Sequence, residues 1–176
     1  MANSLSQLMT DLRAIPTVLA NIGEDHGRVR VKVCRFSTLV AEAAGHQYRL
    51  CEMKADDRPL SIKVWNSADA GMTGVDIGIF TPEVGIVGTE TLTAIDIDGL
   101  VDGATLSSAA AGVEHYGAGT NAVPELVYGK SLWEACIAGP GSRPIVGTLY
   151  EIVASVAGNP AGGGDYSFLI TYLAGD

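Results

Sequence analysis

The cysteines and histidines are the residues of this sequence best suited to metal or nucleophilic chemistry, and their spacing supports neither. No Cys-x-x-Cys pair is present and the number of cysteines is odd, so we expect reduced thiols that pack as small core hydrophobes. The histidines fall in predicted loops beside a glycine or an acid, and we expect a solvated surface there. The residues concerned are Cys34, Cys51, Cys136, His26, His46 and His115.

Three aspartates could offer oxygen ligands to a hard cation such as calcium: Asp96, Asp98 and Asp102. Their order departs from the EF-hand pattern, because no glycine follows at the sixth position and no glutamate closes the loop. Alternation along a strand would place Asp96 and Asp98 together on one solvated face. We therefore expect no metal site in this sequence.

Gly129-Lys130-Ser131 has the ending of a phosphate-binding loop, but the rest of that motif is missing. The motif needs a glycine where Pro124 stands, and proline has no amide to donate to a phosphate. No serine occupies a Gly-x-Ser-x-Gly elbow either. The sequence therefore predicts no enzyme, no cofactor and no small-molecule substrate.

Charge is distributed unevenly along the 176 residues, which carry a net charge of -9. Of the 11 basic residues, 9 lie at or before Lys63 with 7 acids (9 - 7 = +2), and 2 follow with 13 acids (2 - 13 = -11). Such polarity can orient docking on a charged surface, whereas a generic acidic surface that keeps the protein soluble explains it equally well. With 6% aromatic residues and no dense basic face, nucleic acid is not the expected partner.

Targeting and membrane patterns are also missing from the sequence. No apolar run approaches the roughly 20 residues that a membrane-spanning helix needs. The first residues show no basic region followed by an apolar stretch, so we expect no signal peptide and a protein made in a cytosol.

The elements that must position any site are short runs that alternate apolar and polar residues, which is typical of β-strands. In the first run we expect Val29, Val31 and Val33 to enter the core while Arg28, Arg30 and Lys32 face solvent or a partner. The predicted strands are 28 to 36, 47 to 53, 60 to 66, 75 to 80, 84 to 88, 91 to 97, 145 to 156 and 166 to 174. This pattern predicts an all-β fold, an antiparallel β-sandwich of which the jelly roll is one form.

The remaining segments divide the chain into an arm and one domain. Residues 1 to 26 predict an N-terminal arm or short helix, and residues 27 to 176 a β-sandwich domain. We expect a short helix near 130 to 137, and a long loop over 99 to 127, where glycines break the alternation. Thr148 to Val156 is expected to pair with Tyr166 to Tyr172.

Both tryptophans could anchor either the core or an interface. The core is the simpler prediction for Trp65 and Trp133. Trp133 stands beside a glycine-rich segment, which leaves contact with a partner open for that side chain.

The order of several segments resembles capsid decoration, or cement, proteins of tailed bacteriophages. The segments are Gly27 to Val31 leading to Phe36, Tyr48 to Met53, Val75 to Ile79, Asp102 to Ser107, Lys130 to Glu134 and the closing tyrosine-rich strand. The resemblance implies a sandwich, jelly-roll-like and often trimeric, that binds the outside of an icosahedral shell of major capsid protein after assembly in the host cytoplasm. It makes Arg28, Arg30 and Lys32 candidates for contact with an acidic capsid surface.

The sequence is also compatible with two other classes of function. A head-fibre or tail module would bind a host glycan or receptor through the 99 to 127 loop and Trp133. A jelly-roll hydrolase or cupin would need a cluster of histidines and acids, which the sequence does not indicate.

Overall fold

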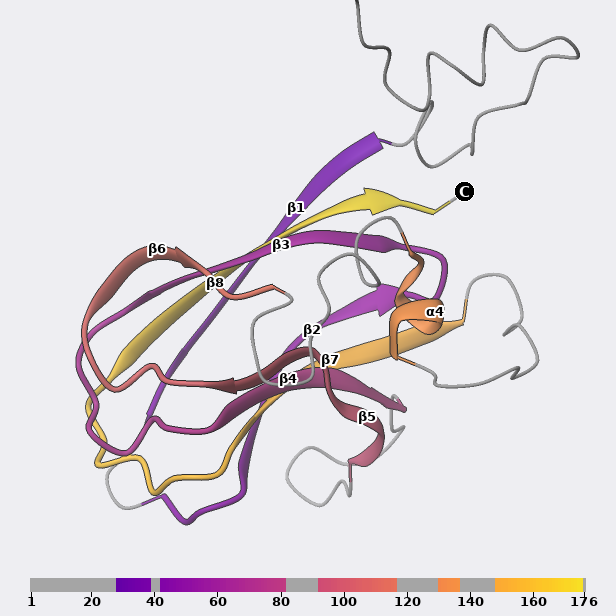
Figure 1. Cartoon of the computed structure of the whole chain (residues 1–176). Coiled ribbons are helices and arrows are strands. Elements are labelled where there is room, and N and C mark those ends of the chain that lie inside the picture. The colour runs from indigo at the N-terminus through magenta and orange to yellow at the C-terminus, as the bar shows by residue number, and fades with distance from the viewer. Residues whose placement is uncertain (1–27, 39–41, 82–91, 117–129, 137–147, 176) are drawn as a thin grey trace, which may run out of the picture.

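The computed structural model describes residues 28–38, 42–81, 92–116, 130–136 and 148–175. These residues form eight strands and one short helix (Figure 1). The strands are β1 (Arg28–Ser37), β2 (His46–Lys54), β3 (Arg58–Asn66), β4 (Val75–Thr81), β5 (Thr93–Ala104), β6 (Ala110–Glu114), β7 (Leu149–Val156) and β8 (Asp165–Ala174), and the helix is α4 (Leu132–Cys136).

The strands form two four-stranded antiparallel sheets packed as a sandwich. The first sheet has the order β1-β8-β3-β6 and the second β2-β7-β4-β5. The chain therefore pairs its first strand with its last, its second with its seventh, its third with its sixth and its fourth with its fifth. This nested pairing, split between two sheets, is the strand order of an eight-stranded jelly roll. The predicted all-β sandwich is confirmed.

The expected hairpin of β7 with β8 is wrong. β7 pairs with β2 and β4 in one sheet, whereas β8 pairs with β1 and β3 in the other. The connection between them crosses from sheet to sheet and packs against the connection from β3 to β4, where the Gly158 amide donates to Thr73. A Cβ on Gly71 would lie 1.5 Å from the Asn159 carbonyl oxygen, so the close approach of these connections requires glycine.

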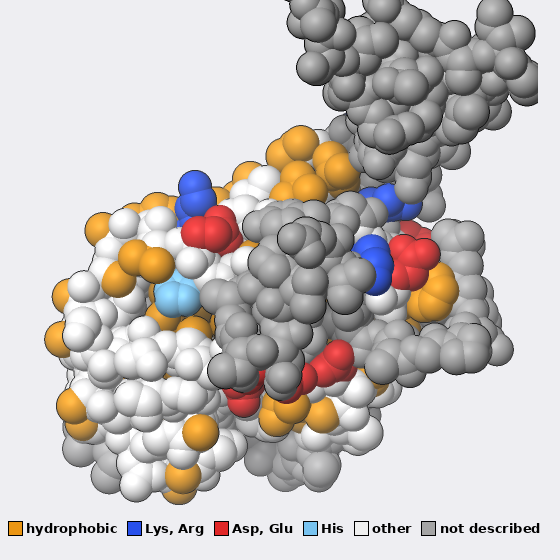
Figure 2. Space-filling view, in the orientation of Figure 1, with side chains coloured by type: hydrophobic (Ala, Val, Ile, Leu, Met, Phe, Trp, Pro, Cys, Tyr) orange, Lys and Arg blue, Asp and Glu red, His pale blue; other side chains and the backbone are white. Residues whose placement is uncertain are grey.

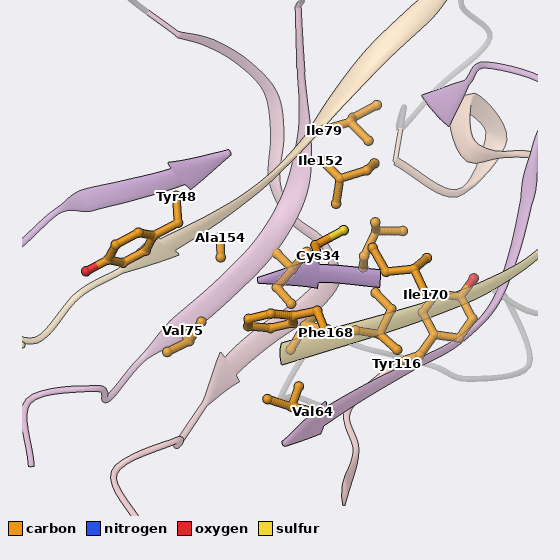
Figure 3. Close-up of a cluster of buried hydrophobic side chains, with 14 of the residues drawn as sticks. Cys34, Tyr48, Val64, Val75, Ile79, Tyr116, Ile152, Ala154, Phe168 and Ile170 are labelled. Atoms are coloured by element: carbon orange, nitrogen blue, oxygen red, sulfur yellow. The ribbon is translucent and has the colours of Figure 1, made fainter. Parts of the chain in front are cut away.

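The core lies between the sheets and is filled by alternate residues of both (Figure 3). β8 contributes a row of large buried side chains, Tyr166, Phe168, Ile170 and Tyr172, and β7 faces it with Ile152 and its neighbours. The Phe36 ring stacks on Tyr48 of the opposite sheet with centroids 4.0 Å apart. The period-two pattern of these strands therefore forms the dry interior that the alternation predicts.

The expected loop over 99 to 127 is wrong in its first half. β5 continues to Ala104 and β6 spans Ala110–Glu114. Both strands carry glycines with positive φ, Gly103 at 67° and Gly112 at 68°, and both pair with register shifts. Glycine-containing bulges interrupt the alternation without ending the strand, which is why the sequence predicts only the first part of β5, as the strand at 91 to 97, and does not predict β6. Residues 117 to 127 lie outside the described residues, as does the predicted strand at 84 to 88.

The short helix near 130 to 137 is confirmed over Leu132–Cys136. Ser131 begins it, because its hydroxyl and its amide both donate to Glu134 Oε2, at 2.6 and 3.0 Å. The Leu132 amide donates to the Asp57 carbonyl oxygen at 2.7 Å, which fixes the helix against the turn between β2 and β3. Leu132 is fully buried by this arrangement.

Candidate docking surface

β1 lies the opposite way round from the expectation, so the prediction that Val29, Val31 and Val33 enter the core is wrong. These valines are 62%, 52% and 58% exposed. The cause is the register with β8, in which Cys34 lies opposite Phe168 and Phe36 opposite Tyr166. Residues directly opposite each other share a face, so the buried aromatic row of β8 turns the even-numbered positions of β1 inward.

The exposed valines join half-buried residues of β8 in a strip that is apolar except for Thr171. Val33 lies opposite Leu169, and Val29 lies opposite Leu173. We call this strip the β1–β8 face and define it as Val29, Val31, Val33, Leu169, Thr171 and Leu173. Figure 2 shows hydrophobic side chains along the upper edge of the molecule, where β1, β3 and β8 lie in Figure 1. β1 is also an edge strand of its sheet, so one side of its backbone has no strand partner among the described residues.

The exposure of the two tryptophans differs from the sequence prediction. Trp65 is 39% exposed, so its core placement is wrong. It lies on β3 opposite Ser167 of β8, and its indole covers Gly112, where a Cβ would come within 2.9 Å of the ring. Trp133 is half-buried and packs against the core cluster. Trp65, which the sequence places in the core, is therefore the more exposed of the two indoles.

A cleft of mixed charge adjoins the β1–β8 face where the edge of β1 meets the edge of β2. It holds about 300 Å³ and is lined by the basic residues Arg30, Lys32 and Lys54, by the acidic residues Glu52 and Asp57, and by apolar residues. Lys32 Nζ donates to the Glu52 carbonyl oxygen across the two edges. Of the three candidate contact residues, the structure brings Arg30 and Lys32 together in this cleft, whereas Arg28 is exposed beyond its lining.

Acidic residues occupy β4 and β5, the latter being the edge strand of its sheet farthest from β2. Burial raises the pKa of Asp96 to about 6, helped by the hydrogen bond that its protonated carboxyl shares with the Asp98 side chain and by the charge of Asp98. Burial also raises the pKa of Asp76, whose Oδ1 accepts a hydrogen bond from the Gly103 amide at 2.7 Å. The sequence separation of basic and acidic residues thus becomes a charge difference between two edges of the sandwich.

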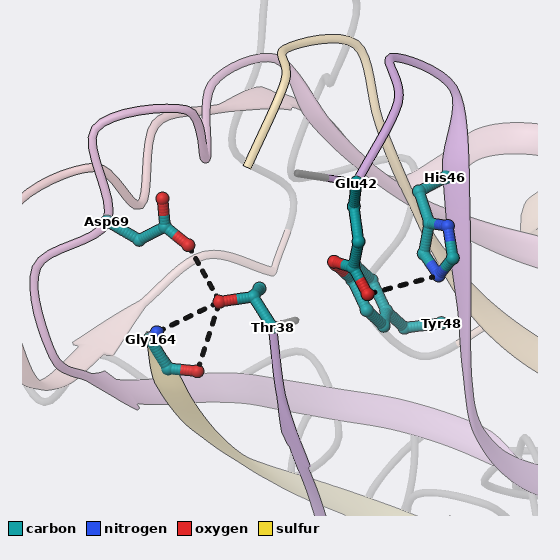
Figure 4. A network of polar contacts seen from close by, with 6 residues as sticks. All are labelled: Thr38, Glu42, His46, Tyr48, Asp69 and Gly164. Atoms are coloured by element: carbon teal, nitrogen blue, oxygen red, sulfur yellow. Dashed lines mark hydrogen bonds and ion pairs between the residues drawn. The ribbon is translucent and has the colours of Figure 1, made fainter. Parts of the chain in front are cut away.

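A buried carboxylate holds together the connections at one end of the sandwich (Figure 4). Asp69 Oδ2 accepts a hydrogen bond from the Thr38 hydroxyl at 2.7 Å, and its Oδ1 accepts from the Ala161 amide at 2.8 Å. Burial acts to raise the pKa of Asp69, but the hydrogen bonds from Thr38, Ala161, Gly71 and Gly162 outweigh it and lower the pKa. These hydrogen bonds join three connections of the fold through one carboxylate, and we interpret the arrangement as structural and call it the Asp69 clasp.

The prediction of histidines in solvated loops is met only in part, because His46 is the first residue of strand β2 and His115, which follows β6, is half-buried. His46 is exposed and lies 3.7 Å from Glu42, which also accepts a hydrogen bond from the Tyr48 hydroxyl (Figure 4). Burial raises the pKa of Tyr48, and the contact with Glu42 adds to the effect. His115 is half-buried, and burial lowers its pKa against the opposing charge of Glu114. His26 lies outside the described residues.

Within the described ranges, no group of three or more histidine, cysteine, aspartate or glutamate side chains could hold a metal ion. In the same part of the chain, no helix has the length and hydropathy to span a membrane. The surface features of the described residues that could bind a partner are the β1–β8 face and the mixed-charge cleft beside it.

The described residues thus form an eight-stranded jelly-roll sandwich with an exposed apolar face. Among solved structures the protein is similar to a chain in the capsid of Ralstonia phage GP4, with a TM-score of 0.53 and 16% identity over 86% of this chain and 88% of that chain. A chain of the cyanophage Pam1 capsid asymmetric unit has a TM-score of 0.43 and 12% identity, over 92% and 96% of the two chains. No family model and no curated protein matches.

Proposed function

We propose that this protein is a non-enzymatic structural component of a tailed-phage virion, which binds the outside of the icosahedral capsid and stabilises it. The observation that carries the proposal is the similarity to the GP4 capsid chain, which covers nearly the whole of both chains rather than a shared subdomain. Jelly-roll sandwiches are a common architecture of viral capsid proteins, which is consistent with that role.

The β1–β8 face is the proposed contact with the major capsid protein. Three valines more than half exposed on one strand are unusual for a free surface, because contiguous apolar area outside the core favours association. Arg28, Arg30 and Lys32 lie on the other side of β1 from the valines, toward the β1 and β2 edges, and would contact an acidic rim on the shell from there. In the same proposal the protein docks as a homotrimer, since repeated symmetric contacts strengthen weak individual interfaces.

Cosedimentation with purified expanded capsids tests the proposal. We expect Val29→Ser, Val31→Ser and Val33→Ser together to reduce occupancy at least tenfold, because they remove the apolar centre of the contact. The matched control is Ile95→Ser with Ile97→Ser, since these side chains are 38% and 41% exposed on β5, at another edge of the sandwich. Circular dichroism and thermal unfolding establish that both variants fold.

Charge reversal supplies an independent arm of the same experiment. Arg28→Glu, Arg30→Glu and Lys32→Glu together should abolish attachment, and wild-type attachment should weaken as salt is raised. Undiminished occupancy in both the valine and the charge variants would refute the proposed contact. Failure of the wild-type protein to bind shells at all would refute the proposed function. The mass of the wild-type protein in solution tests the trimer.

A further inference from the structure

Two cysteines that are remote in sequence lie together where the two sheets meet. Cys34 is buried on the inner side of β1, and Cys51 is half-buried on β2. β1 is the edge of one sheet and β2 the edge of the other, and the Lys32 ammonium bonds the Glu52 carbonyl across them. The two thiols are within hydrogen-bond contact of each other. We propose that Cys34 and Cys51 are an oxidation site that closes into a disulfide joining the two sheets.

The surroundings of the pair favour reaction at one sulfur. The hydrogen bond from Cys51 lowers the pKa of Cys34 against the effect of burial, and the Lys32 charge lowers it further. The same hydrogen bond and burial raise the pKa of Cys51. When the two thiols together have lost one proton, the remaining proton is therefore on Cys51. Cys34 is then the thiolate, which is the reactive form of cysteine.

A pocket of about 120 Å³, which Cys51 lines with Arg49 and Glu151, brings a small oxidant to the Cys51 side of the pair, from which it must reach the buried Cys34 sulfur. Hydrogen peroxide is the oxidant in this proposal. The Cys34 thiolate attacks one peroxide oxygen, the O–O bond breaks, hydroxide leaves, and Cys34 becomes a sulfenic acid. The Cys51 sulfur then attacks the Cys34 sulfur, so that the S–S bond forms, the S–O bond breaks and water leaves with the Cys51 proton. In total, two thiols lose two electrons and one peroxide becomes two waters.

The bond would close a short loop of chain and connect the edges of both sheets. A crosslink of this kind stabilises a protein mainly by restricting its unfolded chain. We therefore expect the oxidised protein to unfold at a midpoint higher by roughly 5 °C than the reduced protein. This expectation does not depend on whether the chain binds a capsid.

The test uses the reduced full-length protein treated with a small excess of hydrogen peroxide. Free thiols are then alkylated in denaturant, and the digest is mapped by mass spectrometry. We expect one crosslinked peptide pair that contains Cys34 and Cys51, lighter by two hydrogen atoms than the reduced pair, with Cys136 alkylated. Adding a reductant should reverse both the crosslink and the gain in midpoint.

Two serine variants separate the proposed bond from general oxidation. Cys136→Ser should keep the crosslink and the rise in midpoint, whereas Cys51→Ser should lose both. Alkylation of both Cys34 and Cys51 after peroxide treatment would overturn the proposal, as would a disulfide that includes Cys136 or sulfinic acid on Cys34 in the wild-type protein. If Cys51→Ser does not fold, the peptide map of the wild-type protein alone shows whether Cys34 and Cys51 form the disulfide.

Discussion

Removal of the Asp69 carboxylate is expected to destabilise the protein by about 3 kcal/mol. Asp69 is 3% exposed and lies in the connection from β3 to β4. Its two oxygens join this connection to Thr38, at the end of β1, and to Ala161, between β7 and β8. Its Oδ1 also accepts the Gly71 amide at 3.3 Å within its own turn. A single side chain thus holds three connections that the jelly-roll order brings to one end of the sandwich.

The magnitude follows from the two short hydrogen bonds. A hydrogen bond to a charged group contributes about 1.5 to 3 kcal/mol net, so losing two costs about 3 kcal/mol at the lower bound. Asp69→Ala also leaves the Ala161 amide without its acceptor. Asp69→Asn keeps the oxygen that faces this amide and loses the charge, so we expect it to cost about half as much. Domains of this kind are stable by only about 5 to 15 kcal/mol, so either loss is measurable.

Urea unfolding followed by tryptophan fluorescence measures the effect. The matched control is Asp165→Ala, because Asp165 is exposed and accepts a hydrogen bond from the Ser37 hydroxyl at 2.6 Å. We expect the control to change the free energy of unfolding by less than about 1 kcal/mol. Equal effects of Asp69→Ala and Asp165→Ala would refute the reasoning that burial of the clasp sets its contribution.

The pH dependence of the same variants provides a second check. The pKa of Asp69 is lowered in the folded protein, so its contribution is present above the ordinary value of 3.8 and is lost as pH falls through the folded value. The difference between wild type and Asp69→Ala should therefore be constant from pH 7 to pH 5. It should shrink when the pH falls below that ordinary value. A difference that shrinks already between pH 7 and pH 5 would contradict the proposed hydrogen bonds.

Two further predictions follow from the core and the acidic edge. The pKa of Asp96 is raised to about 6, so the folded protein binds this proton more tightly than the unfolded chain, and stability should rise as pH falls from 7 to 5. We expect Asp96→Asn to remove about 1 kcal/mol of that rise, a figure reduced for solvent screening, and an unchanged pH slope in urea titrations would contradict the assignment. Phe168→Ala should cost about 3 to 5 kcal/mol by the same titration, because its ring is fully buried between the sheets, and a cost under 1 kcal/mol would mean that the core is packed differently.

Strand positions could be predicted from the sequence, because alternation reports directly on a surface with one dry side. β3, β4 and β8 begin and end within two residues of their predicted bounds. Which side of a strand is dry is a separate question, and β1 shows why. Both the valines of β1 and the pair Cys34 and Phe36 on its other side are apolar enough to be buried. Which of the two sides turns inward therefore depends on the side chains of β8, the neighbouring strand in the same sheet. Those side chains belong to a strand more than a hundred residues away, and local periodicity does not identify them.

Strand pairing and the cysteine contact depend on topology in the same way. β7 and β8 are consecutive and joined by glycines, which favours a hairpin, yet each has partners on both sides in a different sheet. Cys34 and Cys51 come together because β1 and β2 are edges of opposite sheets that meet at one side of the sandwich. Neither outcome has a local signal, since both arise only when the nested pairing of the jelly roll is complete.

The orientation of β1 links the two proposals physically. At the narrow margin of the core, the inward row must fit limited space, and it does so with the small Cys34 and with Lys32, whose long chain reaches the backbone of β2. Turning the strand over would bury the valines but would place Cys34 and Phe36 in solvent and leave Phe168 without its neighbour. The exposed valines are therefore a consequence of that choice. An exposed apolar edge strand favours association with another chain. A partner that covers the β1–β8 face would therefore bury the valines that the fold leaves in solvent.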